Sequence, residues 1–300
     1  MQRVIVTGAN GFVGNHLQHE LDASGIETIG VGYSGSNNTD KLVLLDLTNP
    51  EDCAKLDFSS VSGVIHLAGL AAVGDSFTSP MKYIQTNMGI EINLFEAALK
   101  QNVKPRFLVI SSGSLYDAAA KLPLKETSET IPSSPYAISK LGQEQIAQYY
   151  SRLGFECIIA RPFNHIGPGQ GPGFIVPDLA TQIKEAKENN SREIKVGNLD
   201  TKRDYTDVRD ISKAYRLLLE KGRPGEIYNV CSGKAISGHD ILKGLAKAAG
   251  IEVDPIVDPQ KNRPVDNPII YGDYAKLKRD TGWQPEIGLE QTLADVMSSM

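Results

Sequence analysis

Three glycines near the N-terminus, spaced three residues apart, constrain the fold of this chain most strongly. They follow an apolar run at residues 4–6 and precede apolar residues that recur at helical spacing. A glycine turn between a strand and a helix brings backbone N–H groups and a helix N-terminus onto a pyrophosphate. This context favours a dinucleotide-binding loop over a glycine-rich turn without a ligand. The residues expected to contact the cofactor are Gly8, Asn10, Gly11, Phe12, Val13 and Gly14.

Short apolar segments alternate with helical periods throughout the first half of the chain. Strands are predicted at residues 4–6, 27–31, 42–45, 64–67, 107–110 and 157–160. Long amphipathic segments lie between the last three strands, and one carries an apolar stripe at Ile84, Met88, Ile92, Phe95 and Leu99. This alternation predicts an α/β fold, a Rossmann-like doubly wound parallel sheet with helices on both faces.

The second half of the chain is less regular. Residues 167–173 alternate glycine with other turn-forming residues and must form a loop, so the domain boundary is expected there. Residues 1–165 are predicted to form the dinucleotide-binding domain and residues 166–300 a smaller C-terminal α/β substrate domain. Within the latter, residues 207–231 are expected to return to the large sheet through a helix at about 208–220 and a strand at 227–230.

Composition excludes several classes of partner. The chain has 31 Lys and Arg against 36 Asp and Glu, a net charge of −5 without a long basic run, which argues against nucleic acid. Cys53, Cys157 and Cys231 lack the spacing of a metal site, so no metal is expected, and the pattern fits a reducing compartment. No signal peptide is visible and no apolar run approaches the ~18 residues of a membrane helix. A cytoplasmic protein without a membrane partner is therefore expected.

Ser112, Tyr136 and Lys140 are the predicted catalytic residues. Tyr136 and Lys140 are four apart on a predicted helix and therefore share a face. The lysine cation would favour tyrosinate and bring the pKa of the phenol toward the working pH. Ser112, at the end of the fifth strand, could hydrogen-bond the same substrate oxygen as Tyr136. Beside a dinucleotide loop, this set points to hydride transfer rather than to an ordinary pair on a helix surface.

Residues after the second, third and fourth strands bear on the cofactor. The second strand ends in residues 30–34 without the carboxylate that would bind the ribose of NAD(H), so NADP(H) is permitted and both cofactors remain open. Asp46 and Leu47 could meet the adenine or form a polar turn, with equal weight. The segment after the fourth strand is small enough for the cofactor to pass closely; it consists of Leu67, Ala68 and Gly69.

These motifs resemble the extended short-chain dehydrogenase/reductase superfamily, in particular its nucleotide-sugar enzymes, over essentially the whole chain. The matching segments are residues 7–14, 66–68, 86–87, 111–112, 136–140 and 161–164. Further segments are similar to GDP-4-keto-6-deoxy-D-mannose reductases, at residues 163–170, 195–199, 203–210, 228–233 and 263–264.

The resemblance implies additional contacts and an assembly. It adds Tyr136, Lys140 and Phe163 to the cofactor contacts. The expected contacts to a nucleotide-diphosphate sugar are Asn164, Arg203 and Arg263, although Arg203 beside Asp204 could also form a structural ion pair. The family also implies a homodimer built from the helices that contain residues 84–99 and 136–152.

Three functions are compatible with these residues. The resemblance implies NAD(P)H-dependent reduction of the C4 ketone of a nucleotide-linked 4-keto-6-deoxy sugar, with GDP-D-rhamnose as the product. A 4-epimerase that retains its NAD would use the same three residues. Dehydration is disfavoured because Ser112 is followed by Gly113 and Ser114, where related dehydratases have a carboxylate. A non-catalytic member of the superfamily is disfavoured because the catalytic residues are present.

Overall fold

A seven-stranded parallel sheet forms the centre of the molecule. The computed structural model describes residues 3–34, 42–259 and 268–300. The sheet has the strand order β11-β6-β5-β4-β1-β2-β3, and every neighbouring pair is parallel. The strands are β1 (Arg3–Thr7), β2 (Glu27–Gly32), β3 (Leu42–Leu44), β4 (Gly63–His66), β5 (Arg106–Ile110), β6 (Cys157–Pro162) and β11 (Ile227–Val230). The predicted α/β fold with a doubly wound parallel sheet is confirmed.

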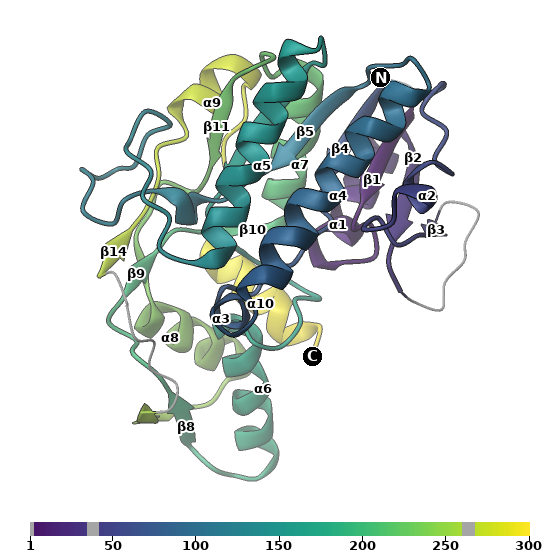
Figure 1. Ribbon diagram of the computed structural model, residues 1–300. Helices are drawn as coiled ribbons and strands as arrows, with labels where there is room; N and C mark the ends of the chain where they lie inside the picture. Colours follow the sequence, from purple (N-terminus) through teal and green to yellow (C-terminus); the bar gives the residue numbers. More distant parts are fainter. Residues whose placement is uncertain (1–2, 35–41, 260–267) are drawn as a thin grey trace.

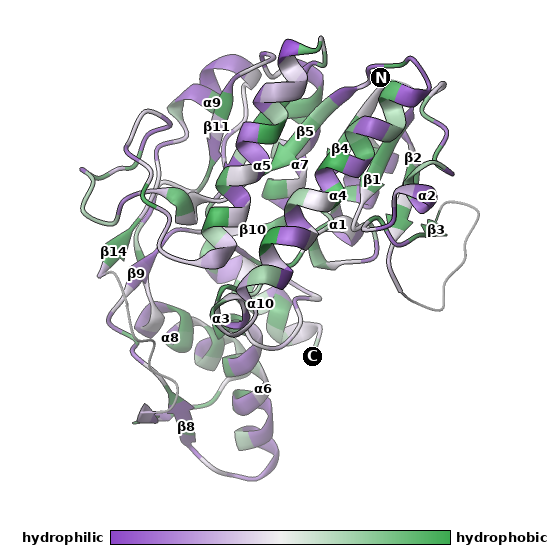
Figure 2. Ribbon diagram, in the orientation of Figure 1, coloured by the Kyte–Doolittle hydropathy of each residue, from purple (hydrophilic) through white to green (hydrophobic). Residues whose placement is uncertain are grey.

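Helices cover both faces of this sheet, and this double burial explains why its strands are continuous apolar runs. Alternate residues of β5 serve opposite faces: Leu108 packs toward α1 (Phe12–Ala23) and α7 (Val208–Lys221). Phe107 packs toward α2 (Pro50–Cys53), α4 (Pro80–Lys100) and α5 (Pro135–Arg152). Figure 1 shows α4 and α5 side by side in front of the sheet with α7 behind it. In Figure 2 the strands β4 and β5 are accordingly green.

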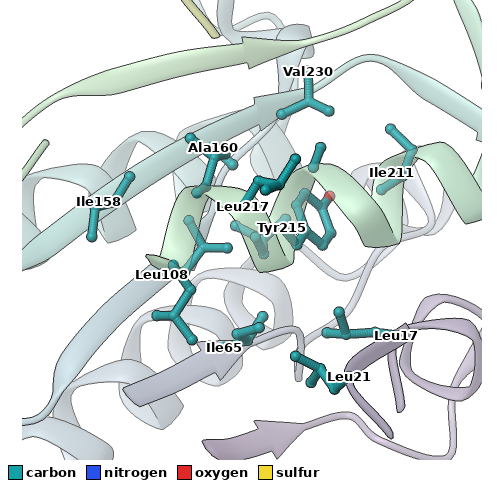
Figure 3. Packing of buried hydrophobic residues seen from close by; sticks show 14 of the residues in the cluster. Leu17, Leu21, Ile65, Leu108, Ile158, Ala160, Ile211, Tyr215, Leu217 and Val230 are labelled. Carbon is teal, nitrogen blue, oxygen red and sulfur yellow. The ribbon is translucent and has the colours of Figure 1, made fainter. Parts of the chain in front are cut away.

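The core on the α7 side joins segments that are far apart in the sequence. Figure 3 shows Leu17 and Leu21 of α1 near Ile65 of β4, and Tyr215 of α7 beside the strands that carry Leu108 and Ala160. Trp283, which follows α9 (Ala275–Thr281), is fully buried in the same cluster. Its indole nitrogen donates to the backbone oxygen of Asp210 at 2.9 Å.

A second cluster of elements packs beyond the carboxyl ends of the strands, in the lower part of Figure 1. Its apolar core is formed mainly by three helices, α6 (Ile175–Glu188), α8 (Gly238–Ala249) and α10 (Leu289–Ser298). Short strands complete it: β7 (Asn164–Ile166), β8 (Glu193–Val196), β9 (Lys202–Arg203), β10 (Tyr205–Asp207), β12 (Ile236–Ser237), β13 (Asp254–Val257) and β14 (Ile269–Ile270). Between β10 and β12 the chain returns to the large sheet through α7 and β11, which pairs with β6, and it then re-enters the second cluster.

The buried face of α4 differs from the predicted stripe. Ile92 is 38% exposed, whereas Asn87 and Glu91 are fully buried. The sequence stripe followed apolar residues, but α4 packs against polar groups of α5: the Asn87 amide donates to Ser139 Oγ at 2.9 Å. A helix that faces polar partners buries polar residues. Among the residues described, no helix is long and apolar enough to cross a bilayer.

Candidate active site

The strand order reverses between β1 and β4, because the chain runs outward from β1 to one edge and from β4 to the other. In open α/β sheets, ligands bind outside the carboxyl ends of the strands at this point. Here Thr7 ends β1 and is followed by the glycine loop, and His66 ends β4 and is followed by Leu67. The two predicted cofactor segments, one after Thr7 and one after His66, therefore lie next to each other at the point where the strand order reverses.

The glycine loop is too tightly folded to accept side chains. Gly8 has a φ of +68°, and a Cβ atom on it would lie 3.0 Å from the backbone nitrogen of Ala68. A Cβ on Gly11 would lie 3.1 Å from the Gly8 oxygen, and one on Gly14 only 2.2 Å from the same oxygen. These positions require glycine for the loop to close over the start of α1.

The N-terminus of α1 is prepared for an anion. Gly11 is its N-cap and supplies no side-chain hydrogen bond, and the first turn, which begins with Phe12 and Val13, has no acidic residue. The first N–H groups of a helix have no partner within the helix, so they remain available to phosphate oxygens. The loop and the helix start thus fit the pyrophosphate of a nicotinamide dinucleotide.

Two further predicted cofactor segments lie beside β2 and β3. The Asn10 amide donates to the backbone oxygen of Ser34, just after β2. Asp46 forms a polar turn after β3, accepting from the Thr48 N–H at 2.9 Å and from the Thr48 hydroxyl at 2.6 Å. Leu47 is buried in the core of the α4 side. Contact of Asp46 and Leu47 with the adenine stays a prediction.

Asn87 of α4 fixes the loop after β4, and the sequence analysis did not assign it to the site. Its side chain accepts from the Leu70 N–H at 2.7 Å and donates to the Leu70 oxygen at 3.1 Å. A Cβ on Gly69, whose φ is +150°, would lie 2.8 Å from Asn87 Oδ1. Ala68 is held from the other side, because its N–H donates to Thr7 Oγ1 at 3.1 Å. The available signal was the match of residues 86–87 to the superfamily, which did not by itself give Asn87 a role.

Tyr136 and Ser112 come together at the carboxyl end of β5. Tyr136 lies in the first turn of α5 and is buried. Burial raises the pKa of Tyr136, a hydrogen bond with Ser112 opposes this shift, and nearby Tyr83 adds to it. The phenol is therefore protonated at neutral pH, as a proton donor must be.

Ser114 sets the direction of the Ser112 hydrogen bonds. Ser112 Oγ accepts from the Ser114 N–H at 3.1 Å and from the Ser114 hydroxyl at 2.9 Å. With its oxygen occupied by two donors, Ser112 has its own proton left to donate. Sequence reasoning missed this role of Ser114, because a serine two residues after another serine carries no specific signal.

Lys140 lies one turn farther along α5 and is also buried. Its ammonium donates to the Ile110 oxygen at 2.8 Å and lies 5.9 Å from the centroid of the Tyr136 ring. Burial lowers the pKa of Lys140 to about 8, against a raising effect of Glu91. The expected lowering of the Tyr136 pKa by Lys140 is not seen in this arrangement, because burial dominates the pKa of the phenol.

A buried ion pair braces the strands below these residues. Arg161 of β6 donates from Nε and Nη2 to the two carboxylate oxygens of Glu144 on α5, each at 2.7 Å. Ser111 Oγ donates to the same carboxylate at 2.6 Å. The Arg161 guanidinium also lies over the Tyr116 ring, 4.9 Å from its centroid. This bidentate pair ties α5 to the ends of β5 and β6.

The residues assigned to the sugar nucleotide lie around the start of the second cluster. Phe163 is buried, and a Cβ on Gly113 would lie 3.0 Å from its ring. Asn164 is exposed on β7, which pairs with β10 so that Asn164 lies opposite Tyr205. Arg203 on β9 donates from Nη1 to the Lys202 oxygen at 2.9 Å. Arg263 lies outside the described residues.

The carboxylate of Asp204 binds two segments that are distant in the sequence, residues 232–233 and residue 272. It accepts from the backbone N–H groups of Ser232, Gly233 and Gly272 at 2.7, 2.9 and 3.2 Å. The negative charge of Asp204 is thus met by backbone donors, which offset part of its burial. The role of Arg203, in diphosphate binding or in an ion pair with Asp204, stays a prediction.

The Rossmann-like sheet, the glycine loop at its switch point and the Tyr136–Ser112–Lys140 set define the class of extended short-chain dehydrogenases/reductases. Residues 4–231 match the model of the NAD dependent epimerase/dehydratase family. The chain belongs to this family and is an NAD(P)-dependent oxidoreductase of the extended short-chain type.

Individual relatives extend along the whole chain. It is 36% identical to GDP-6-deoxy-D-mannose reductase of Pseudomonas aeruginosa, covering 99% of this chain and 96% of the relative. It is 29% identical to UDP-glucose 4-epimerase of Pisum sativum, covering 98% and 94%. The solved structure of RMD from Pseudomonas aeruginosa complexed with NADPH superposes with a TM-score of 0.88 at 36% identity, covering 100% of this chain and 99% of that chain.

Proposed function

We propose that this enzyme reduces the C4 ketone of a nucleotide-linked 4-keto-6-deoxy sugar, and that its substrate is GDP-4-keto-6-deoxy-D-mannose and its product GDP-D-rhamnose. The observation that carries the proposal is the buried Tyr136 phenol, hydrogen-bonded with Ser112 at the carboxyl end of β5. The choice of sugar nucleotide is supported by the 36% identity to GDP-6-deoxy-D-mannose reductase.

In this mechanism Tyr136 gives its proton to the ketone oxygen, while Ser112 donates a hydrogen bond to the same oxygen. A bound nicotinamide cofactor supplies the hydride to the carbonyl carbon. The phenolate left on Tyr136 is stabilised by the Lys140 ammonium, which lies on the same face of α5. The ketone thus gains one hydride and one proton to become an alcohol. Burial of Tyr136 and Lys140 strengthens both interactions, because water is excluded.

Loss of water is not part of the proposed reaction. Dehydration needs a carboxylate near the serine, and position 113 is a glycine at which even a Cβ would lie only 3.0 Å from the Phe163 ring. Ser114 is committed to Ser112. The residues after Ser112 therefore support reduction or epimerisation rather than elimination.

The cofactor assignment within the proposal is NADPH. The end of β2 at Gly32, followed by Tyr33 and Ser34, lacks the carboxylate that would bind the ribose hydroxyls of NADH and repel a 2′-phosphate. The relative in complex with NADPH supports the same choice.

The function is tested by following NADPH oxidation with enzymatically prepared GDP-4-keto-6-deoxy-D-mannose, with NADH in parallel. Turnover with NADPH and formation of GDP-D-rhamnose support the proposal. A 4-epimerase is the second candidate, favoured by the relatives named UDP-glucose 4-epimerase. NAD that remains bound through purification, together with no oxidation of added NADPH, would establish the epimerase and remove the reductase.

Arg203→Ala is expected to raise the KM for the sugar nucleotide about tenfold or more, because a guanidinium–diphosphate pair is a charge-assisted interaction. The Kd of NADPH, measured by fluorescence titration, should change less than twofold. Lys195→Ala on β8 is a control for the loss of one positive charge in the same part of the molecule. Equal weakening of sugar nucleotide and NADPH in Arg203→Ala would rule out the diphosphate role.

The proposed assembly is a homodimer through α4 and α5. Met81 and Ile92 of α4 are 64% and 38% exposed, and their spacing of eleven residues places them about 20° apart around the helix. Ile138 of α5 is 48% exposed. A second copy that covers these apolar side chains would remove them from water.

The double variant Ile92→Asp/Ile138→Asp is expected to convert the dimer to a monomer, because each subunit would bury two carboxylates in the interface. Light scattering at micromolar concentration measures the change. Ile256→Asp, at a 44% exposed position on β13, is the matched control and should remain dimeric. A monomeric parent protein under these conditions would contradict the proposed assembly.

A further inference from the structure

Glu91 is a carboxylic acid enclosed between α4, α5 and the sheet. It is completely buried, and in the part of the chain that the structure describes its two carboxyl oxygens meet no donor with full hydrogen-bond geometry, although the Gln143 side chain lies close enough to lower its pKa. A buried carboxylate without donors is strongly disfavoured. The mechanism above assigns no role to this residue, although it lies near Lys140 on the catalytic helix.

The charged neighbours of Glu91 are engaged elsewhere. Lys140 donates to the Ile110 oxygen, and Glu144 is paired with Arg161. Among the described residues, the titratable groups whose pKa is coupled to Glu91 are Lys140, Glu144, Tyr150 and Cys157, on α5 and β6. Burial raises the pKa of Glu91 well above its ordinary value, and the opposing effects of Lys140 and Gln143 are smaller. Burial therefore favours the protonated, neutral form of Glu91.

Gln143 supplies the partner that a protonated Glu91 needs. Its Oε1 is the second buried acceptor here without a donor among the described residues, and its Nε2 lies 3.2 Å from His66 Nε2. A proton on Glu91 donated to Gln143 Oε1 would satisfy both side chains at once. The Gln143 amide then donates from Nε2 to His66 Nε2.

The hydrogen bonds of His66 continue the same donor-to-acceptor order toward β1. Burial, with a smaller effect of Lys140, lowers the pKa of His66 to about 3, so the imidazole is neutral. If Nε2 accepts from Gln143, the ring proton is on Nδ1, which lies 2.9 Å from Thr7 Oγ1. Thr7 Oγ1 also accepts the Ala68 N–H, so the series ends between the two cofactor loops.

We propose that Glu91 is a positioning residue that acts as a neutral carboxylic acid: its proton orients Gln143 and His66 and thereby holds the glycine loop and the segment after β4 against the catalytic helix. The inference rests on nicotinamide binding at this crevice and is independent of the identity of the sugar nucleotide.

The same hydrogen bonds in the opposite donor-to-acceptor order predict a different protonation of the His66 ring. An ionised Glu91 would accept from a rotated Gln143 amide, Gln143 Oε1 would accept from His66 Nε2–H, and Thr7 would donate to Nδ1. All heavy-atom distances would be unchanged, because an amide rotation exchanges nitrogen for oxygen. The two arrangements therefore differ in which nitrogen of His66 carries the proton.

Nitrogen-15 NMR of histidine-labelled protein without cofactor decides between them. The His66 signals are assigned by their loss in His66→Asn, and unchanged signals of the other four histidines show that this variant is folded. The expected spectrum at neutral pH is that of the Nδ1–H form of the neutral ring. An Nε2–H form would overturn the proposal, whatever substrate the enzyme uses.

Variants of Glu91 test its positioning role. Glu91→Gln keeps a donor toward Gln143 and should keep the Nδ1–H form and the Kd of NADPH within about twofold of the parent. Glu91→Met leaves Gln143 Oε1 without a donor and should raise that Kd about tenfold. Glu96→Gln, on the same helix but paired with Tyr150, is the control for an unrelated carboxylate.

Loss of affinity in Glu91→Gln equal to that in Glu91→Met would show that the negative charge, not the proton, is required, and the proposal would be wrong. Equal affinity in all three proteins would also contradict it. If Glu91→Met does not fold, the His66 spectrum of the parent and of Glu91→Gln still decides.

Discussion

Tyr136→Phe is expected to lower kcat by about a thousandfold, in line with the loss of a positioned general acid. The variant keeps the buried ring and removes only the hydroxyl that hydrogen-bonds Ser112. Its KM and the Kd of NADPH should remain within about twofold, because a group that acts mainly in the transition state contributes little to ground-state binding. Steady-state NADPH oxidation and fluorescence titration measure the two quantities separately.

Tyr149→Phe is the matched control for this substitution. Tyr149 lies on the same helix, but it is half exposed and near the end away from the site. Its kcat should equal that of the parent protein. A Tyr136→Phe enzyme that retains more than a tenth of the parent kcat would mean that another group protonates the ketone oxygen.

Gly14→Ala is expected to weaken NADPH binding by about 30- to 100-fold, through about 2–3 kcal/mol of strain. The added Cβ would lie 2.2 Å from the Gly8 oxygen and 2.6 Å from the Ala9 oxygen, so the backbone of the loop must move. Movement there displaces the N–H groups that face the pyrophosphate. The melting temperature should also fall by about 5 °C.

A graded series makes this prediction specific to close packing. Gly11→Ala places its Cβ 3.1 Å from the Gly8 oxygen and should have a smaller effect than Gly14→Ala. Gly74→Ala in α3 (Val73–Thr78) has open space among the described residues and should change stability by less than about 0.5 kcal/mol. If the order of the Kd values did not follow the order of these distances, steric closure of the loop would not explain its glycines.

The central sheet was predictable because most of its strands are buried on both faces, with the edge strand β3 as the partly exposed exception. A continuous apolar run such as β1 or β5 has few other uses in a chain of this composition, and the predicted bounds agree with the structure to within about two residues. The short strands of the second cluster were not predictable in the same way. β9, β12 and β14 have two residues each, too few to show a period, and long-range pairing alone defines them.

In the candidate site, the residues predicted from motifs are those whose chemistry depends on residue type and spacing, such as Tyr136 and Lys140. The structure adds residues that act through others: Ser114 occupies the oxygen of Ser112, and Asn87 holds the loop after β4. A buried polar residue on an amphipathic helix, such as Glu91, contradicts the expected apolar stripe. Sequence periodicity treats such a residue as solvent-facing, and packing alone reveals the opposite.

The pairing of β11 with β6 affects how the molecule can be assembled during synthesis. Between these two strands the chain passes through β7, α6, β8, β9 and β10 of the second cluster and then through α7, so the edge of the nucleotide-binding sheet is completed late. Until β11 arrives, β6 presents an unpaired edge that can recruit another chain. The two cores are therefore expected to fold as one interdependent unit on the ribosome, with the last strand closing the first core only after the second has begun to form.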